Sequence, residues 1–325
     1  TAIMPDPTGY GRIIRNFNGE FKKIVEHKDA TIAEKTVMEV NTGIYCFKAD
    51  KLFSALSRIG HDNAQGEYYL PDVLEIIQND GDKICAVAAE SYEAALGINS
   101  REQLADAEKI LHRRKNHQLM IDGVTIMDPD TTYIDIDVKI GQDTIIYPST
   151  WIQGTSDIGS NCEIGPCSRF SNTSIGNGAV VSFTYAHDCE IGAEATIGPY
   201  VHLRPNTKIA DKVHIGDFVE VKNSNVGEGT KLPHLSYIGD SDVGSNVNMG
   251  CGCITVNYDG KKKYRTTIED NAFIGCNSNL VAPVKVGSGA YIGAGTTITK
   301  DVPDGELAVG RARQTNIANW HDKRK

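Results

Sequence analysis

An apolar residue recurs at every sixth position through most of the second half of the chain. Unbroken series run over residues 134–170, 191–221 and 268–298, and a shorter one starts at Ile175 after a five-residue step. Glycine often follows the apolar residue, as in Ile158-Gly159, which suits a corner where a side chain would obstruct the backbone. The period predicts a parallel β-solenoid in which each unit is one short strand plus a corner, and three units close a coil.

The region before these repeats has a different pattern. Residues 41–49 and 84–91 are apolar runs typical of strands, whereas residues 68–80 have apolar positions at helical spacing. This alternation predicts an α/β domain. Residues 101–120 contain no Gly or Pro and predict one helix, about 30 Å long, whose run Arg113-Arg114-Lys115 should face solvent. We therefore divide the chain into an α/β domain (1–100), a linking helix (101–120) and a β-helix domain with a C-terminal tail (121–325).

Composition narrows the class of protein only a little. With 40% hydrophobic and 23% charged residues the chain is a typical globular protein, and its net charge of -9 argues against a nucleic-acid partner. No apolar run approaches the roughly 18 residues of a membrane span. The eight cysteines lack the spacing of a zinc site, so we expect free thiols in a reducing, cytoplasmic setting. Since Thr1 opens what reads as the middle of a domain, we expect a fragment or a processed product.

The six-residue period fails within residues 231–266, where His234 is followed by a segment that holds Asn257, Tyr258 and three consecutive lysines. In repeat proteins, function resides in the departures from the scaffold. A purely structural or ice-binding solenoid needs a flat and regular outer face, and the outward positions here are irregular and often charged. A binding module without chemistry and an enzyme both stay open. The gathering of His, Tyr, Asn and Lys favours the enzyme, because these side chains have no packing reason to cluster on a coil.

These residue types are the ones that acyl transfer to a sugar amine requires. A protonated amine must lose a proton before it attacks, and a histidine such as His234 suits that general-base role. The oxyanion that then forms needs donors, which Asn257, Tyr258 or backbone N–H groups can supply. Taken singly, each of these also reads as an ordinary solvent-side residue. A phosphorylated substrate needs cations, and the candidates are Arg204, Lys222 and Lys263.

Several motifs follow one another along the chain, among them "DPTGYGRI" (6–13), "EVNTGIY" (39–45), "LRPNT" (203–207), "HLSYIGD" (234–240) and "VNYDGKKKY" (256–264). Together they resemble one enzyme family over essentially the whole length. That family is the bacterial bifunctional N-acetylglucosamine-1-phosphate uridyltransferase/glucosamine-1-phosphate acetyltransferase. The resemblance implies a left-handed β-helix, a homotrimer formed through it, and acetyl transfer from acetyl-CoA to glucosamine-1-phosphate for UDP-N-acetylglucosamine and cell-envelope synthesis.

The same resemblance implies roles for residues of the solenoid. His234 matches the catalytic base, and the segment 255–268 matches a loop that reaches a neighbouring subunit. Cys at two coenzyme positions indicates a packing role, although a ping-pong route through Cys251 or Cys253 is open on chemistry alone. The matched substrate-binding residues are Arg204, Lys222, Tyr237, Asn248, Asn257, Tyr258 and Lys263. The matched acetyl-CoA-binding residues are Cys251, Cys276, Ala294 and Arg311.

The first domain resembles only the sugar-binding part of the uridyltransferase. Gly11, Glu26, Asn41 and Asn99 match residues near the sugar nucleotide, and Asn99 matches one Mg²⁺ ligand. The family's glycine-rich loop and its second Mg²⁺ ligand, an Asp, are not found in this sequence, and a lone Asn should hold Mg²⁺ poorly. We therefore expect no uridyltransferase activity from this chain. The alternative is a native protein with upstream sequence and both activities.

Overall fold

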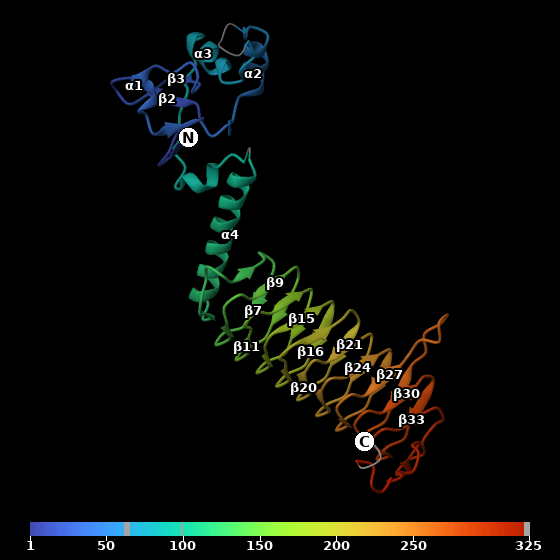
Figure 1. Cartoon of the computed structure of the whole chain (residues 1–325). Coiled ribbons are helices and arrows are strands. Elements are labelled where there is room, and N and C mark those ends of the chain that lie inside the picture. Colours follow the sequence, from blue (N-terminus) through green and yellow to red (C-terminus); the bar gives the residue numbers. More distant parts are fainter. Residues whose placement is uncertain (62–65, 99, 322–325) are drawn as a thin grey trace. The chain divides into compact units, whose positions relative to one another are not determined.

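The computed structural model describes residues 1–61, 66–98 and 100–321. It divides into two compact units, Thr1–Ile110 and Leu111–Lys325, and the boundary falls inside helix α4 (Arg101–Ile121), where the sequence predicts a helix (Figure 1). Among the described residues, no helix combines the length and the apolar character that crossing a bilayer requires.

The first unit is built on a small antiparallel sheet. Its strand order is β1-β4-β2-β3, and helices α2 and α3 pack apolar side chains such as Ala55 and Leu74 against Ile13 and Phe21 of the sheet. The predicted helix within 68–80 is present as α3. The strands are β1 (Ala2–Ile3), β2 (Arg12–Arg15), β3 (Phe21–Val25) and β4 (Glu39–Val40). The helices are α1 (Ile32–Lys35), α2 (Ala49–Leu56), α3 (Asp72–Asn79) and the 3₁₀ turn η1 (Tyr92–Ala95).

The strands predicted at 41–49 and 84–91 are wrong. Both segments lack regular strand pairing, and Ala49 already begins α2. The second segment is held by two bonds to the chain start, since the Thr1 ammonium donates to the Val87 carbonyl at 2.7 Å and the Ala89 N–H donates to the Thr1 carbonyl at 2.8 Å. Because a strand forms only where a neighbour supplies a hydrogen-bonding ladder, apolar character alone did not decide the structure here.

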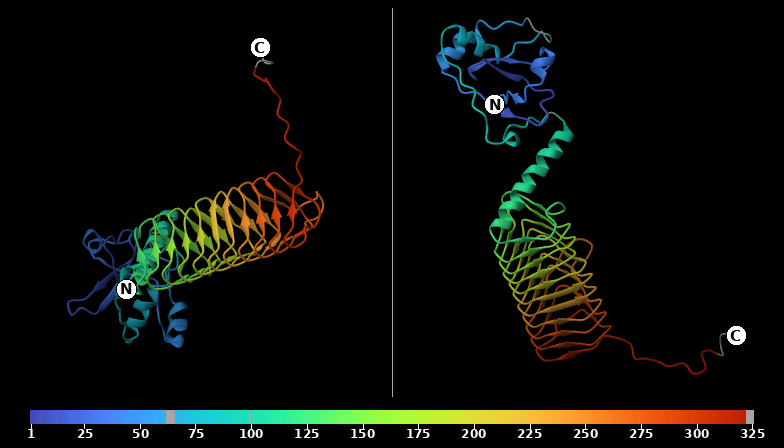
Figure 2. Two further views of the ribbon diagram at one scale, coloured as in Figure 1. Left: turned by 90° about the horizontal axis from the view of Figure 1, so that it is seen from below. Right: turned by 90° about the vertical axis from the view of Figure 1, so that its left-hand side faces the viewer.

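The second unit is the predicted solenoid. Successive strands pass through three parallel sheets in turn, which we call sheets I, II and III, and each set of three closes one coil (Figure 2). Sheet I contains β5 (Thr125–Ile126), β8 (Ile145–Ile146), β11 (Glu163–Ile164), β14 (Val180–Val181), β17 (Thr196–Ile197), β20 (His214–Asp217), β23 (Lys231–His234), β26 (Asn248–Met249), β29 (Phe273–Ile274), β32 (Tyr291–Ile292) and β34 (Leu307–Ala308).

The other two sheets have the same construction. Sheet II contains β6 (Tyr133–Ile134), β9 (Trp151–Gln153), β12 (Arg169–Ser171), β15 (Thr184–His187), β18 (Val201–Leu203), β21 (Glu220–Lys222), β24 (Tyr237–Gly239), β27 (Ile254–Val256), β30 (Asn279–Val281) and β33 (Thr297–Ile298). Sheet III contains β7 (Lys139–Ile140), β10 (Asp157–Ile158), β13 (Ser174–Ile175), β16 (Cys189–Ile191), β19 (Thr207–Ile209), β22 (Asn225–Val226), β25 (Ser241–Val243), β28 (Thr266–Ile268) and β31 (Val284–Val286).

The six-residue period arises because every coil repeats the same positions. Ile158 pairs with Ile175 and Ile164 pairs with Val181 in register, so the apolar side chains stack on one another inside the solenoid. All four are at most 4% exposed. The resulting column of buried aliphatic groups supplies the hydrophobic free energy that holds the coils together.

The corner between sheets II and III has a feature that matters below. In five successive coils its residue adopts a left-handed backbone with φ between 46° and 61°. Asn and Asp tolerate this conformation better than other residues with a side chain. The five corner residues are Asn172, Asp188, Asn206, Asn223 and Asp240.

The second half of α4 covers the start of the solenoid. Asn116 is fully buried, and its side-chain amide donates to the carbonyls of Pro129 and Thr132 at 3.0 and 2.9 Å. The Lys115 ammonium donates to the carbonyls of Ile136 and Val138, and its partial burial lowers its pKa. The prediction that Lys115 faces solvent is therefore wrong. Its ammonium is held by the hydrogen bonds that it donates to backbone carbonyls of the first coil.

We expect Asn116→Ala to destabilise the solenoid unit by about 2 kcal/mol, because the buried Thr132 carbonyl and the partly buried Pro129 carbonyl lose their donor. Urea unfolding followed by circular dichroism would measure the change. Gln118→Ala is the matched control, since Gln118 is an exposed amide on the same helix. Equal effects of the two substitutions would contradict the assignment.

Candidate active site

His234 heads a column of residues that runs along the edge of sheet I. Lys231, Asn248, Phe273 and Tyr291 pair in register in successive coils. The residue three positions after each therefore occupies one column, which contains His234, Cys251, Cys276 and Ala294. Backbone bonds confirm the stacking, because the Asn277 N–H donates to the Cys251 carbonyl at 2.7 Å and the Gly295 N–H donates to the Cys276 carbonyl at 2.8 Å.

The His234 column brings together all the residues matched to acetyl-CoA binding. Neighbouring strands lie about 4.8 Å apart, so three steps from His234 to Ala294 span about 14 Å. Arg311 extends the column by one coil, since its guanidinium donates to the Ala294 carbonyl. Beyond His234 the side chains are small, and Cys276 and Ala294 are exposed. The structure thus offers an open strip with a histidine at one end and an arginine at the other.

A second group, formed by Arg204, Glu220 and Tyr237, lies on the outer face of sheet II. Glu220 pairs in register with Tyr237, and the Glu220 carboxylate accepts from the Arg204 guanidinium at 2.9 Å. Tyr237 lies over Gly239, where an added Cβ would come within 2.3 Å of the tyrosine oxygen. Glycine at 239 therefore leaves the space in which the Tyr237 ring lies.

At the corner between sheets II and III, Lys222, Asp240 and Asn257 form a compact polar cluster. The Lys222 ammonium is 3.8 Å from an Asp240 carboxylate oxygen, to which the Asn257 amide also donates. The same amide donates to the Tyr237 hydroxyl at 3.4 Å. Contact with the Lys263 ammonium, together with burial and the charge of Arg204, lowers the pKa of Lys222. Two ammonium groups thus lie near one buried carboxylate, and the Arg204 guanidinium is close enough for its charge to act on Lys222. Such a group of cations is suited to bind a phosphate.

The segment after β27 leaves the coil, as the break in the period predicts (Figure 1, orange). It folds back as a hairpin, in which Tyr258 and Lys263 form an antiparallel bridge and the Tyr264 N–H donates to the Asn257 carbonyl at 2.9 Å. Asp259 closes the tip by accepting from the N–H groups of Lys261 and Lys262, which lowers the pKa of its carboxyl. Tyr258 is 55% exposed. The hairpin carries Lys263 to Lys222 and presents Tyr258 to solvent.

One chain does not gather the whole matched set on one surface. Asn248 lies on sheet I, between Lys231 and Phe273, whereas Tyr237 and Lys222 lie on sheet II. Sequence reasoning also missed three residues that the structure adds to the cluster: Glu220, Asn223 and Asp240. The missed signal is spacing, because each lies 16 to 18 positions, or one coil, from its partner.

The buried thiol of Cys253 does not favour a cysteine nucleophile. Its sulfur donates to the Gly275 carbonyl, and burial raises its pKa to about 11. The thiolate, which is the reactive form, is therefore scarce near neutral pH. Cys251 is half-buried and belongs to the His234 column.

In the first unit, three of the four matched sugar-nucleotide residues lie together. The Asn41 N–H donates to the Gly11 carbonyl at 2.8 Å, and a Cβ on Gly11 would lie 2.9 Å from a Glu26 carboxylate oxygen. Burial, with help from the charges of Asp29 and Asp72, raises the pKa of Glu26. Asn99 lies outside the described residues.

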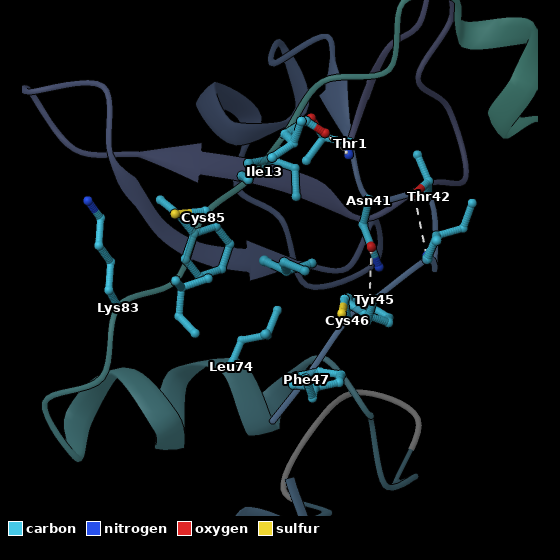
Figure 3. A pocket seen from close by; sticks show the side chains of 16 residues that line it. Thr1, Ile13, Asn41, Thr42, Tyr45, Cys46, Phe47, Leu74, Lys83 and Cys85 are labelled. Atoms are coloured by element: carbon cyan, nitrogen blue, oxygen red, sulfur yellow. Dashed lines mark hydrogen bonds between the residues drawn. The ribbon is translucent and has the colours of Figure 1, made fainter. Parts of the chain in front are cut away.

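A cavity of about 520 Å³ adjoins this group and is lined by Asn41, Tyr45 and apolar side chains such as Phe21 and Leu74 (Figure 3). The Tyr45 hydroxyl donates to the Asn41 side-chain oxygen at 2.9 Å, and burial raises the pKa of Tyr45. Across the described ranges, no group of three His, Cys, Asp or Glu side chains is placed to hold a metal ion. We assign no step to Mg²⁺.

Comparison with known proteins agrees with this geometry. Residues 188–223 and 265–300 match the family model "Bacterial transferase hexapeptide (six repeats)", so the solenoid is that of the hexapeptide transferases. The chain is 55% identical to "Bifunctional protein GlmU" of Geobacillus sp. (strain WCH70), over 99% of this chain and 70% of the relative. It is 56% identical to the protein of the same name from Caldanaerobacter subterraneus subsp. tengcongensis, over 100% of this chain and 71% of the relative. The chain belongs to the bifunctional GlmU family.

Among solved structures, the solenoid is similar to an Arabidopsis UDP-N-acetylglucosamine acyltransferase. That likeness covers 54% of this chain and 68% of the other, with 17% identity and a TM-score of 0.41.

We predict that iodoacetamide will label Cys276 in the native protein at neutral pH and leave Cys253 unlabelled. Cys276 is exposed, whereas Cys253 is buried and its raised pKa leaves little thiolate. Peptide mass mapping would follow the two sites, with urea-unfolded protein as the control in which both react. Equal labelling of both thiols in the native protein would contradict this description.

Proposed function

We propose that the solenoid unit transfers the acetyl group of acetyl-CoA to the amine of glucosamine-1-phosphate, giving N-acetylglucosamine-1-phosphate for UDP-N-acetylglucosamine synthesis. Membership of the bifunctional GlmU family supports this activity. The observation that carries the assignment to this site is that the short strand β24 separates His234 from Asp240, so that the candidate base and the cation cluster lie at the two ends of one strand, with Tyr237 between them.

His234 acts as the general base in this proposal. It ends β23 and is exposed. Its carbonyl accepts from the Ser236 hydroxyl at 2.8 Å, which holds the main chain of the corner. The imidazole takes a proton from the ammonium of the sugar, and the freed lone pair attacks the thioester carbonyl. The tetrahedral intermediate then collapses: the C–S bond breaks with its electron pair going to sulfur, the nitrogen loses its second proton, and the CoA thiolate takes up a proton and leaves as the thiol.

The other residues bind and orient the two substrates. The sugar phosphate binds to Arg204, Lys222 and Lys263 through charge-assisted hydrogen bonds. Acetyl-CoA lies along the His234 column, where the small side chains of Cys251, Cys276 and Ala294 leave room for the pantetheine arm. Arg311 then binds a phosphate of the coenzyme. In this arrangement Tyr237 and Asn257 orient the sugar between the base and the phosphate site.

We propose that the active form is a homotrimer in which a neighbouring chain completes the site. Asn248 and Tyr258 support this, because within one chain Asn248 lies on sheet I, whereas the cation cluster lies on sheet II, and Tyr258 is exposed to solvent. An apolar ridge also follows the corner between sheets I and II and ends beside His234. It consists of Phe183, Tyr200, Phe218 and Leu235, which are 37%, 57%, 59% and 58% exposed.

The character of the three faces favours the ridge as the interface. Tyr200 and Phe218 stack with ring centroids 5.3 Å apart, and sheet II adds Trp151 and Tyr185 nearby. Sheet III instead carries ion pairs such as Lys208–Glu190 at 2.8 Å. An exposed apolar strip flanked by a charged face is typical of a protein interface.

We also propose a cytoplasmic location, in line with eight free cysteines.

His234→Ala should lower turnover about a hundredfold or more, because general-base catalysis contributes that much. Release of the CoA thiol with glucosamine-1-phosphate as acceptor would measure it. His214→Ala is the control, since His214 is an exposed histidine of the preceding coil on the same sheet. Wild-type turnover by His234→Ala would refute the base assignment. Absence of thiol release by the wild-type chain would instead favour a binding module.

Phe218→Glu should convert the trimer to monomer and abolish turnover, because a carboxylate would be buried in an apolar contact. Light scattering after size exclusion gives the mass. Lys208→Ala on sheet III is the control and should stay trimeric and active. A trimeric Phe218→Glu protein would show that the ridge is not the interface.

A further inference from the structure

Asp240 is the most buried charged residue of the cation cluster, with only 5% of its surface exposed. Its carboxylate accepts from two amides, those of Asn223 and Asn257, and lies 3.8 Å from the Lys222 ammonium. A carboxylate in such a position costs free energy unless its partners are in place. We therefore expect Asp240 to hold Asn223, Asn257 and Lys222 in place, and these three residues to hold the Asp240 carboxylate.

The corner conformation does not require a carboxylate at this position. Asn occupies the equivalent left-handed corner at 172, 206 and 223. Asp188 occupies it too, and accepts from Asn172 as Asp240 accepts from Asn223. Asp188 is exposed, however, and the residues around Asp240 are the ones that the acetyl-transfer site uses. The charge of Asp240 thus needs an explanation other than the fold of the corner.

We propose that Asp240 is a positioning residue of the acetyl-transfer site: its carboxylate fixes the Asn257 amide beside Tyr237, and it serves as the counter-ion of Lys222 and Lys263 until a phosphate group binds. This inference rests on the proposed function for its catalytic half. The phosphate half rests on the geometry alone.

The electrostatics of the cluster agree with this role. Burial by itself would raise the pKa of Asp240, but the hydrogen bonds from Asn223 and Asn257 and the charges of Lys222 and Lys263 outweigh it and keep the pKa below its usual value. The carboxylate therefore stays ionised. Without it, the Lys222 and Lys263 ammonium groups would repel each other with no internal anion between them, because their contact already lowers the pKa of Lys222.

The carboxylate also decides where the Asn257 amide points. Both Asn223 and Asn257 donate N–H groups to Asp240. An amide at 240 has one acceptor oxygen and an NH₂ group, so it cannot accept from both neighbours as two carboxylate oxygens do. The Asn257 side chain would then lose the bond that holds it against the Tyr237 hydroxyl.

Asp240→Asn tests the proposal in the full-length chain. We expect turnover of glucosamine-1-phosphate to fall about tenfold or more, since a small misplacement at a reacting centre is costly. We expect inorganic phosphate to bind at least about threefold more tightly by calorimetry, because the site has lost an anion. Damage to the fold would weaken phosphate binding, so the two explanations predict opposite signs. Asp188→Asn is the matched control and should change neither quantity.

A charge swap guards against loss of folding. Asn223→Asp combined with Asp240→Asn keeps one carboxylate and one amide at the two corners but moves the charge one coil away from Asn257. The swap should restore the melting temperature and leave turnover low. Restored turnover in the swap, wild-type turnover in Asp240→Asn, or phosphate binding that is unchanged or weaker would each overturn the proposal. If the wild-type chain shows no acetyl transfer, the proposed function fails, whereas the phosphate comparison still decides the role of Asp240 as counter-ion.

Discussion

The in-register stacking of identical positions in successive coils is the constraint on which the second unit depends. Because Ile158 lies on Ile175 and Ile164 on Val181, every position of the repeat becomes a column that runs along the solenoid. Inward columns are aliphatic and supply the hydrophobic free energy. Outward columns carry no such requirement, so they can hold chemically useful side chains without loss of packing. The His234 column, the apolar ridge and the left-handed corners are three such columns.

The same constraint explains how the candidate site was predictable in part. The period located the solenoid and its interruption, and the motifs predicted His234, Lys222 and Asn257 as candidates. Contacts between coils were not evident, because Asp240 and Lys222 are 18 residues apart and only the coil length makes them neighbours. A search at separations of 16 to 18 residues would also have found the pairs Arg204–Glu220 and Asn223–Asp240. Asn257 lies beyond the regular strands, and its contact with Asp240 depends on how the chain turns into the hairpin.

The first unit shows why pattern alone was less informative there. Its helix α3 formed where apolar spacing predicted it, because a helix satisfies its backbone hydrogen bonds internally. The segments at 41–49 and 84–91 have strand-like composition but no ladder in the described structure. A strand depends on a partner elsewhere in the chain, and no local pattern reports whether that partner is present. Asn41 nevertheless reaches Gly11, since one backbone bond is enough to place it.

The hairpin after β27 interrupts a packing pattern that is otherwise kept for many coils, and charge gives a reason for it. Lys222 is supplied by the regular face of sheet II, and a second ammonium in direct contact with it is unfavourable unless an anion lies beside the pair. The left-handed corner supplies that anion as Asp240, and the hairpin delivers Lys263 and Asn257 to it from outside the coil. A regular coil would have placed the next outward residues in line with Lys222, where they could not surround a phosphate. Leaving the period therefore converts a one-dimensional column of charges into a cluster, in which the buried carboxylate offsets the repulsion between the two ammonium groups.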